Sequence, residues 1–115
     1  MHKLSVGLWL SLFITPSIVQ AEGEATFGAH CARCHAPVEI ERRMRGEWAG
    51  RSADLLYEVT RQTMPGETPG SLSDDEYVAV VAYMLDLAGV TRPDGELRAN
   101  QLAGIAIDAS IRDEA

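Results

Sequence analysis

Several residue types are scarce in this 115-residue sequence, and their scarcity limits what the chain can be. The two cysteines, Cys31 and Cys34, have no second pair with which to build a zinc site. A disulfide between them would close a loop of only four residues and would add little stability. The sequence also has no internal repeat, no low-complexity stretch and a single lysine, Lys3. These absences favour one domain that is stabilised by something other than disulfides.

The longest apolar run covers residues 4–19 and follows the basic start Met1-His2-Lys3. Its 16 residues fall short of the roughly 20 that are needed to span a bilayer. A short basic start, an apolar run and the small residue Ala21 are the parts of a secretory signal peptide, in that order. We therefore predict that residues 1–21 are removed, that the protein is periplasmic, and that the mature chain does not span a membrane.

The remaining 94 residues carry nine arginines and no lysine against 17 acidic residues, which gives a net charge of −8. Nucleic acid and anionic membranes are poor partners for a chain of that charge. The acidity serves either solubility alone or an acidic docking face, and composition does not distinguish the two. A chain of this length is also marginal for a self-sufficient apolar core.

Helical patterns occur in three segments. Residues 24–32 form a short one that leads directly into the two cysteines. In residues 52–64, Ser52 stands where an N-cap is expected and Pro65 ends the pattern. The residues predicted to share one face of that helix are Leu55, Leu56, Val59 and Thr63.

The third and strongest pattern begins with a capping box, in which Ser73 is followed three residues later by Glu76. An apolar stripe with helical spacing follows, and Gly89 stands where a left-handed glycine ends many helices. The stripe consists of Tyr77, Val80, Val81, Met84, Leu85 and Ala88. Beyond it the sequence is polar. We therefore predict a domain over residues 22–91 and a tail over residues 92–115 that wraps this domain.

The run Cys31-Ala32-Arg33-Cys34-His35 is the Cys-x-x-Cys-His pattern of c-type haem attachment. Two thiols about one helical turn apart reach neighbouring vinyl groups, and the next histidine is turned under the ring toward the iron. We therefore predict one covalent haem c, attached through Cys31 and Cys34, with His35 as the proximal iron ligand. A buried porphyrin would supply the apolar surface that so short a chain lacks. A thiol–disulfide protein without haem is the alternative interpretation of the two cysteines.

Five residues are candidates for the other iron position: Met44, Met64, Met84, His2 and His30. His2 leaves with the signal peptide, and His30 adjoins the cysteines on the proximal side. Met84 belongs to the buried stripe, and Met44 follows His35 too closely to reach the opposite face. Met64 ends a predicted helix 29 residues after His35, and the following Pro65 forms a turn that directs its thioether. We predict Met64 as the distal ligand.

This order of elements resembles the class I cytochromes c over nearly all of the mature chain. In that family a glycine and an aromatic residue on the first helix pack against an aromatic residue of the last helix. Gly23 and Phe27 match the first pair, and Val80 and Tyr83 are the facing positions. The resemblance implies an all-α cytochrome c fold, a small bundle of about three to four helices around one covalently bound haem.

A finer similarity, carried by residues 48–57 and 64–73, is to the small cytochrome domains that accompany quinoprotein dehydrogenases. It implies an electron carrier and not an enzyme, with a periplasmic dehydrogenase as donor and another cytochrome or an oxidase as acceptor. The chain departs from larger members of the class in two ways. The short interval between His35 and Met64 removes the usual backbone partner of the proximal imidazole, and the lysines that guide some members to their oxidases are absent.

Other residues of that interval have two interpretations each. Trp48 is expected to contact the haem, as a propionate donor or as a filler at the haem edge. The basic run is either a solvated face or the source of one propionate partner, and it consists of Arg42, Arg43, Arg45 and Arg51. The alternative function is a haem enzyme or a gas or redox sensor, in which the iron is five-coordinate or Met64 dissociates. The sequence offers that function no distal acid–base group.

Overall fold

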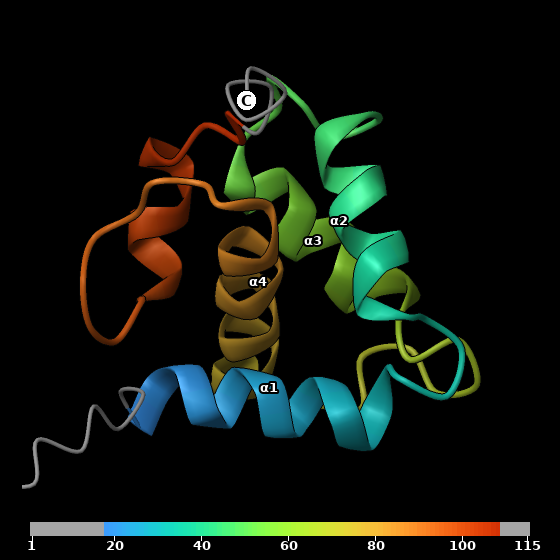
Figure 1. Ribbon diagram of the computed structural model, residues 1–115. Coiled ribbons are helices and arrows are strands. Elements are labelled where there is room, and N and C mark those ends of the chain that lie inside the picture. The colour runs from blue at the N-terminus through green and yellow to red at the C-terminus, as the bar shows by residue number, and fades with distance from the viewer. Residues whose placement is uncertain (1–17, 109–115) are drawn as a thin grey trace, which may run out of the picture.

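The computed structural model describes residues 18–108, and the described residues contain helices but no β-strand (Figure 1). The α-helices are α1 (Ile18–His30), α2 (Pro37–Arg45), α3 (Ala53–Thr63) and α4 (Asp74–Ala88), and η1 (Ala99–Gly104) is a 3-10 helix. The predicted all-α fold is confirmed. Most of the predicted signal peptide, residues 1–17, lies outside the described residues. Within the described part, none of the helices has both the length and the apolar character needed to cross a membrane.

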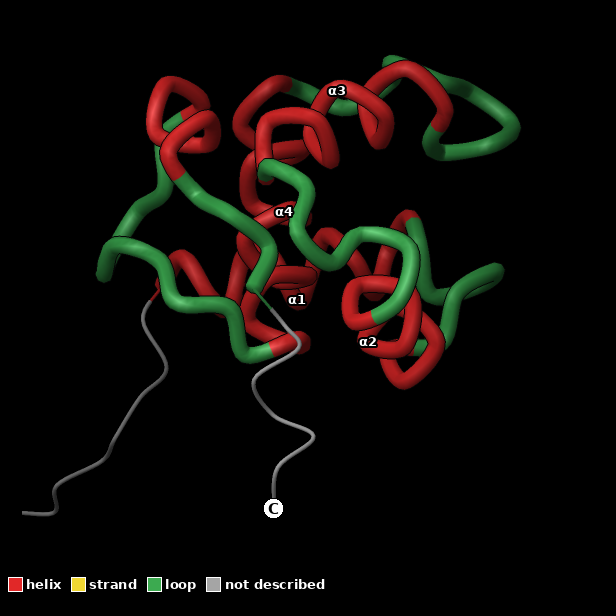
Figure 2. Tube along the Cα trace, turned by 90° about the horizontal axis from the view of Figure 1, so that it is seen from above, coloured by secondary structure: helices red, strands yellow, loops and turns green. Residues whose placement is uncertain are grey.

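Helix α4 lies at the centre of the fold. In Figure 1 α1 crosses it, α2 and α3 lie on one side of it, and η1 lies on the other. The view in Figure 2 shows α2 and α3 at separate positions around it. Buried residues on α4 comprise Tyr77, Val78, Ala79, Val80, Val81, Ala82, Met84, Leu85 and Ala88. The helix therefore packs on several sides and is the main element of the core.

The predicted ends of α4 are confirmed. The Ser73 hydroxyl accepts a hydrogen bond from the Glu76 backbone N–H at 3.1 Å, and the Glu76 carboxylate accepts one from the Ser73 N–H at 3.0 Å. Gly89 follows the last turn with φ of 71°, in the left-handed region that glycine adopts without a steric penalty. These bonds fix where α4 starts and stops.

Helices α1 and α4 cross in close contact at Gly23. A side chain at this position would collide with the backbone carbonyl of Ala79 and would lie 3.0 Å from the Cβ of Tyr83. One turn further along α1, the rings of Phe27 and Tyr83 pack with centroids 5.1 Å apart. Tyr83 therefore lies at the crossing as expected, whereas Ala79 and not Val80 is the other residue nearest to Gly23.

Helix α2 is a structural element that the sequence patterns did not predict. Pro37 begins it, and Ile40 and Met44, four residues apart, point into the core. On its other face Glu39 pairs with Arg43 at 3.0 Å, and an equivalent pair joins Glu41 and Arg45 at 2.7 Å. Most of the basic run is therefore the last turn of a helix, where cations interact favourably with the helix dipole.

Helix α3 differs from its prediction in two respects. Ser52 precedes its first turn in an extended conformation, but the Ser52 side chain makes no capping hydrogen bond. Of the residues predicted to share one face, Leu56 is buried, whereas Leu55 and Val59 are 42% and 37% exposed. Three of the four residues predicted to share a face, Leu56, Val59 and Thr63, line one cavity, whereas Leu55 does not.

The segment after α4 contributes to the core. Its buried side chains are Val90, Leu97, Leu102, Ile105 and Ile107. The Ala53 N–H donates to the Ile105 carbonyl at 2.9 Å, and the Ile107 N–H donates to the Arg51 carbonyl at 2.8 Å. The guanidinium of Arg92 binds both carboxylate oxygens of Asp86, at 2.8 and 3.0 Å, and so turns the chain back along α4.

We expect Gly23→Ala to destabilise the protein by about 1–3 kcal/mol, because the added methyl group forces α1 away from α4. Gly28→Ala is the matched control, since it lies on the same helix and its Cβ would meet nothing within 4 Å. The control should be neutral or stabilising by about 0.5–1 kcal/mol. Denaturant unfolding of both variants measures the difference, and equal stabilities would show that the crossing is not tight.

We expect Ile107→Ala to lower the free energy of unfolding by about 2–5 kcal/mol, as for other fully buried aliphatic residues. Val38→Ala, on an exposed side chain, is the control and should change the stability by less than about 0.5 kcal/mol. Thermal and denaturant unfolding measure both. A small effect of Ile107→Ala would mean that this segment does not belong to the cooperative domain.

Candidate haem site

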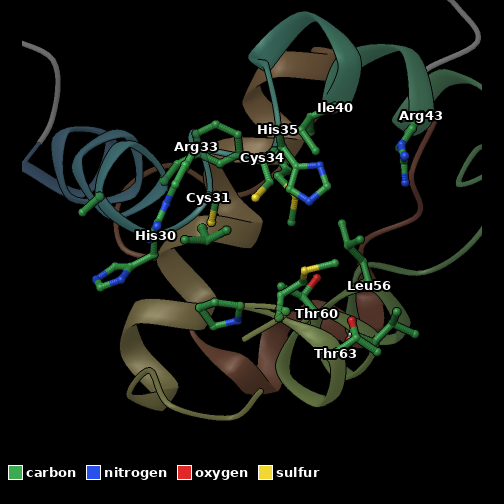
Figure 3. A pocket seen from close by; sticks show the side chains of 18 of the residues that line it. His30, Cys31, Arg33, Cys34, His35, Ile40, Arg43, Leu56, Thr60 and Thr63 are labelled. Carbon is green, nitrogen blue, oxygen red and sulfur yellow. Dashed lines mark hydrogen bonds between the residues drawn. The ribbon is translucent and has the colours of Figure 1, made fainter. Parts of the chain in front are cut away.

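A cavity of about 360 Å³ is enclosed by residues from all four α-helices and from the loop after α3 (Figure 3). This volume lies in the range of about 300–1,000 Å³ that is typical of sites for small molecules and cofactors. Its apolar wall includes Phe27, Ile40, Met44, Leu56, Val80 and Met84. Such a wall excludes water and suits a large, flat, apolar ligand.

The motif residues lie in a helical turn that continues α1. The backbone N–H groups of Cys31 and Ala32 both donate to the Phe27 carbonyl, and that of His35 donates to the Cys31 carbonyl at 2.9 Å. This turn brings Cys31, Cys34 and His35 to the wall of the cavity (Figure 3). Three residues that the sequence predicted as one attachment site therefore face one space.

The environment of the thiols does not resemble that of a redox-active cysteine pair. Cys31 and Cys34 are both free, and Cys31 packs against the core. Burial raises the pKa of the Cys31 thiol, whereas a thiol–disulfide exchange site depends on a lowered cysteine pKa. Among the described residues, no group of three or more His, Cys, Asp or Glu side chains is placed to hold a metal ion.

The imidazole of His35 lies over the cavity, and its Nδ1 is buried without a hydrogen-bond partner among the described residues. The nearest carboxylate oxygen is Oε1 of Glu39, at 3.9 Å. The other cavity histidine, His30, is exposed, and its ring is turned away from His35 (Figure 3). Of the two histidines, His35 is thus the one directed at a ligand within the cavity.

Three methionines line the cavity: Met44, Met64 and Met84. Helix α2 carries Met44 to the wall of this cavity. Met44 and Met84 are core residues, 1% and 6% exposed. Met64, in contrast, lies where α3 ends, in an extended conformation, and its N–H still donates to the Thr60 carbonyl at 2.8 Å.

The loop that carries Met64 is held to α4 by a buried tyrosine. The Tyr77 hydroxyl donates to the Met64 carbonyl at 2.8 Å and accepts from the Leu72 N–H at 3.3 Å. The sequence placed Tyr77 in the apolar stripe and missed this role. The sequence could have indicated this role, because a tyrosine in a buried stripe usually forms a hydrogen bond through its hydroxyl group.

Trp48 lines the cavity and is partly buried against the core. The guanidinium of Arg51 lies 5.6 Å from the centre of its ring, a cation–π contact. Within the basic run, Arg43 is the arginine that lines the cavity. It is therefore the member of that run best placed to reach an anionic group there.

These residues fit a haem. The cavity offers two free thiols, an imidazole with one buried nitrogen, methionine sulfurs and an apolar wall. A site of this kind on an all-α fold defines a small c-type cytochrome with one covalently bound haem c.

Comparison with known proteins gives the family. The family described as "Cytochrome C oxidase, cbb3-type, subunit III" matches residues 19–84, more than half of the chain. A similar protein is a cytochrome c6 from Diacronema lutheri, which is 30% identical over 82 residues, covering 60% of this chain and 96% of the relative. No solved structure matches the chain significantly. The chain belongs to the c-type cytochromes of this family, which are electron carriers.

We expect Tyr77→Phe to destabilise the protein by about 1–3 kcal/mol, because it leaves the half-buried Met64 carbonyl without its donor. The amide of Leu72 should also exchange faster with solvent. Tyr83→Phe, which keeps the ring contact with Phe27, is the control for loss of a tyrosine hydroxyl on α4. Hydrogen exchange of residues 64–72 measures the effect, and equal protection in the two variants would contradict it.

Proposed function

We propose that the protein carries single electrons through a haem attached at Cys31 and Cys34, with His35 and Met64 as the axial ligands of the iron. The supporting observation is the convergence of these four residues on one cavity, from two segments far apart in the sequence. Met64 is favoured over the other methionines because its backbone is fixed at the end of α3 by Thr60 and Tyr77. Met44 and Met84 have the buried surroundings of core-filling methionines.

When bound, the haem supplies a one-electron iron couple. The role of the protein is to hold an imidazole and a thioether at fixed positions and to keep water away from the iron. A thioether ligand favours the reduced iron relative to a second imidazole. With both axial positions filled by side chains, no position remains for a substrate, and the site is suited to electron transfer.

Electrons enter and leave, in this proposal, where the cavity meets solvent. Cys34 lines the cavity and is exposed, whereas Cys31 is half-buried, so the haem edge beside Cys34 would be the accessible one. The proposed partners are an exported dehydrogenase as donor and another cytochrome or an oxidase as acceptor. The family description, which names an oxidase subunit, supports the acceptor, and the resemblance to quinoprotein-associated domains supports the donor. The periplasmic location that the leader predicts is part of this proposal.

We expect the oxidised haem protein to be low-spin and to show the weak near-infrared band of a sulfur-to-iron bond. Met64→Ala should abolish this band and open the iron to CO, because alanine supplies no ligand in place of the thioether. Met44→Leu and Met84→Leu are the controls and should keep the band. Absorption spectra of the four haem-loaded proteins provide the measurement. Loss of the band in a control but not in Met64→Ala would reassign the ligand, and a high-spin wild type would favour a haem enzyme or a sensor.

A further inference from the structure

The buried Nδ1 of His35 needs a partner once the other ring nitrogen binds iron. A histidine that ligates a metal almost always donates its remaining N–H to a carboxylate, a carbonyl or water, and this bond fixes the tautomer and the ring orientation. In this structure Nδ1 is buried and has no partner among the described residues. A donor left in that state would be unfavourable, so the surroundings must provide an acceptor.

The backbone next to His35 is a poor source of that acceptor. The carbonyl of Ala36 already accepts from the N–H groups of Glu39 and Ile40, at 3.0 and 3.2 Å, in the first turn of α2. Pro37 begins the helix at once, so the chain that directly follows His35 and Ala36 forms a helix and not a loop. The chain after the attachment motif is therefore helical at the point where a longer loop could have supplied a backbone carbonyl.

The carboxylate of Glu39 is the acceptor within reach. It lies four residues after His35, and its Oε1 is 3.9 Å from Nδ1. That separation is longer than a hydrogen bond, and a change of under 1 Å in side-chain position would close it to the usual range of about 2.7–3.2 Å. The same Oε1 is held at 3.0 Å by Arg43, whose guanidinium keeps the carboxylate beside the cavity.

We propose that Glu39 is a positioning residue, which accepts the Nδ1–H of His35 and so sets the donor strength of the iron ligand. This inference rests on the proposed role of His35 as the proximal ligand. A carboxylate acceptor makes the imidazole more basic than a carbonyl would, and a more basic ligand stabilises oxidised iron. Glu39 therefore lowers the reduction potential, opposite to the effect of the Met64 thioether. The pairing with Arg43 moderates this influence, since the arginine withdraws charge from the same oxygen.

The test compares Glu39→Gln with Glu41→Gln in the haem-loaded protein. The two glutamates have side-chain exposures of 35% and 36%, and each pairs with an arginine four residues later on α2. Both variants remove one charge and one ion pair, and only Glu39 faces His35. Glu39→Gln should raise the ratio of reduced to oxidised protein, measured at a fixed solution potential, by about tenfold. This corresponds to a rise of about 59 mV in the reduction potential of a one-electron couple. An equal shift in the two variants would contradict the proposal.

A second measurement distinguishes the hydrogen bond from a general effect of charge. In the reduced, ¹⁵N-histidine-labelled protein, the Nδ1–H proton of His35 should be visible by NMR and protected from exchange in the wild type and in Glu41→Gln. In Glu39→Ala the proton should exchange at least about tenfold faster, because its acceptor is gone. Unchanged exchange would assign the acceptor to water or to backbone and would overturn the proposal.

Failure of the proposal is distinct from failure of the proposed function. If His35 does not bind the iron, the wild-type spectrum itself departs from the low-spin form before any variant is compared. If His35 binds and Glu39 has no role, the wild-type spectrum is low-spin and Glu39→Gln behaves as Glu41→Gln does.

Discussion

The close contact of α1 with α4 at Gly23 is the constraint on which the site depends. Because no side chain separates the helices there, Phe27 packs on Tyr83 and the end of α1 is fixed. The turn with Cys31, Cys34 and His35 continues directly from that end. The far side of the cavity is fixed by the same helix, since Tyr77 of α4 holds the carbonyl of Met64. A single helix thus positions the two segments that the haem would join.

The rest of the fold completes a core that is small for an isolated domain. The segment after α4 adds five buried apolar side chains and pairs its backbone with residues 50–53, at the start of α3. Even so, a cavity of about 360 Å³ remains, and its wall is largely apolar. An apolar wall of that extent is stabilised when a large apolar group removes it from water. The haem is therefore expected to contribute to stability as well as to electron transfer.

The sequence predicted those parts of the molecule whose signals are local. The capping box at Ser73, the glycine at the end of α4 and the attachment motif depend on residues a few positions apart, and the structure has the first two as predicted. Helix α2 was not predicted, because its helical signal is a single apolar pair, Ile40 and Met44, within a segment that is otherwise rich in arginine. The contributions of Ile107 and Tyr77 depend on contacts with distant segments, which a one-dimensional pattern does not contain. At α3 the pattern did predict most of the side that meets the cavity, since Leu56, Val59 and Thr63 line it and Leu55 does not.

In the proposed function, the imidazole of His35, before α2, and the thioether of Met64, at the end of α3, would both hold the iron. The most direct measurement is the proton NMR spectrum of the reduced wild-type protein, because the porphyrin ring shifts protons that lie over its face to unusually high field. The account predicts one methionine methyl signal in that region, assigned through the chain to Met64. Assignment of the signal to Met44 or Met84, or its absence, would contradict it.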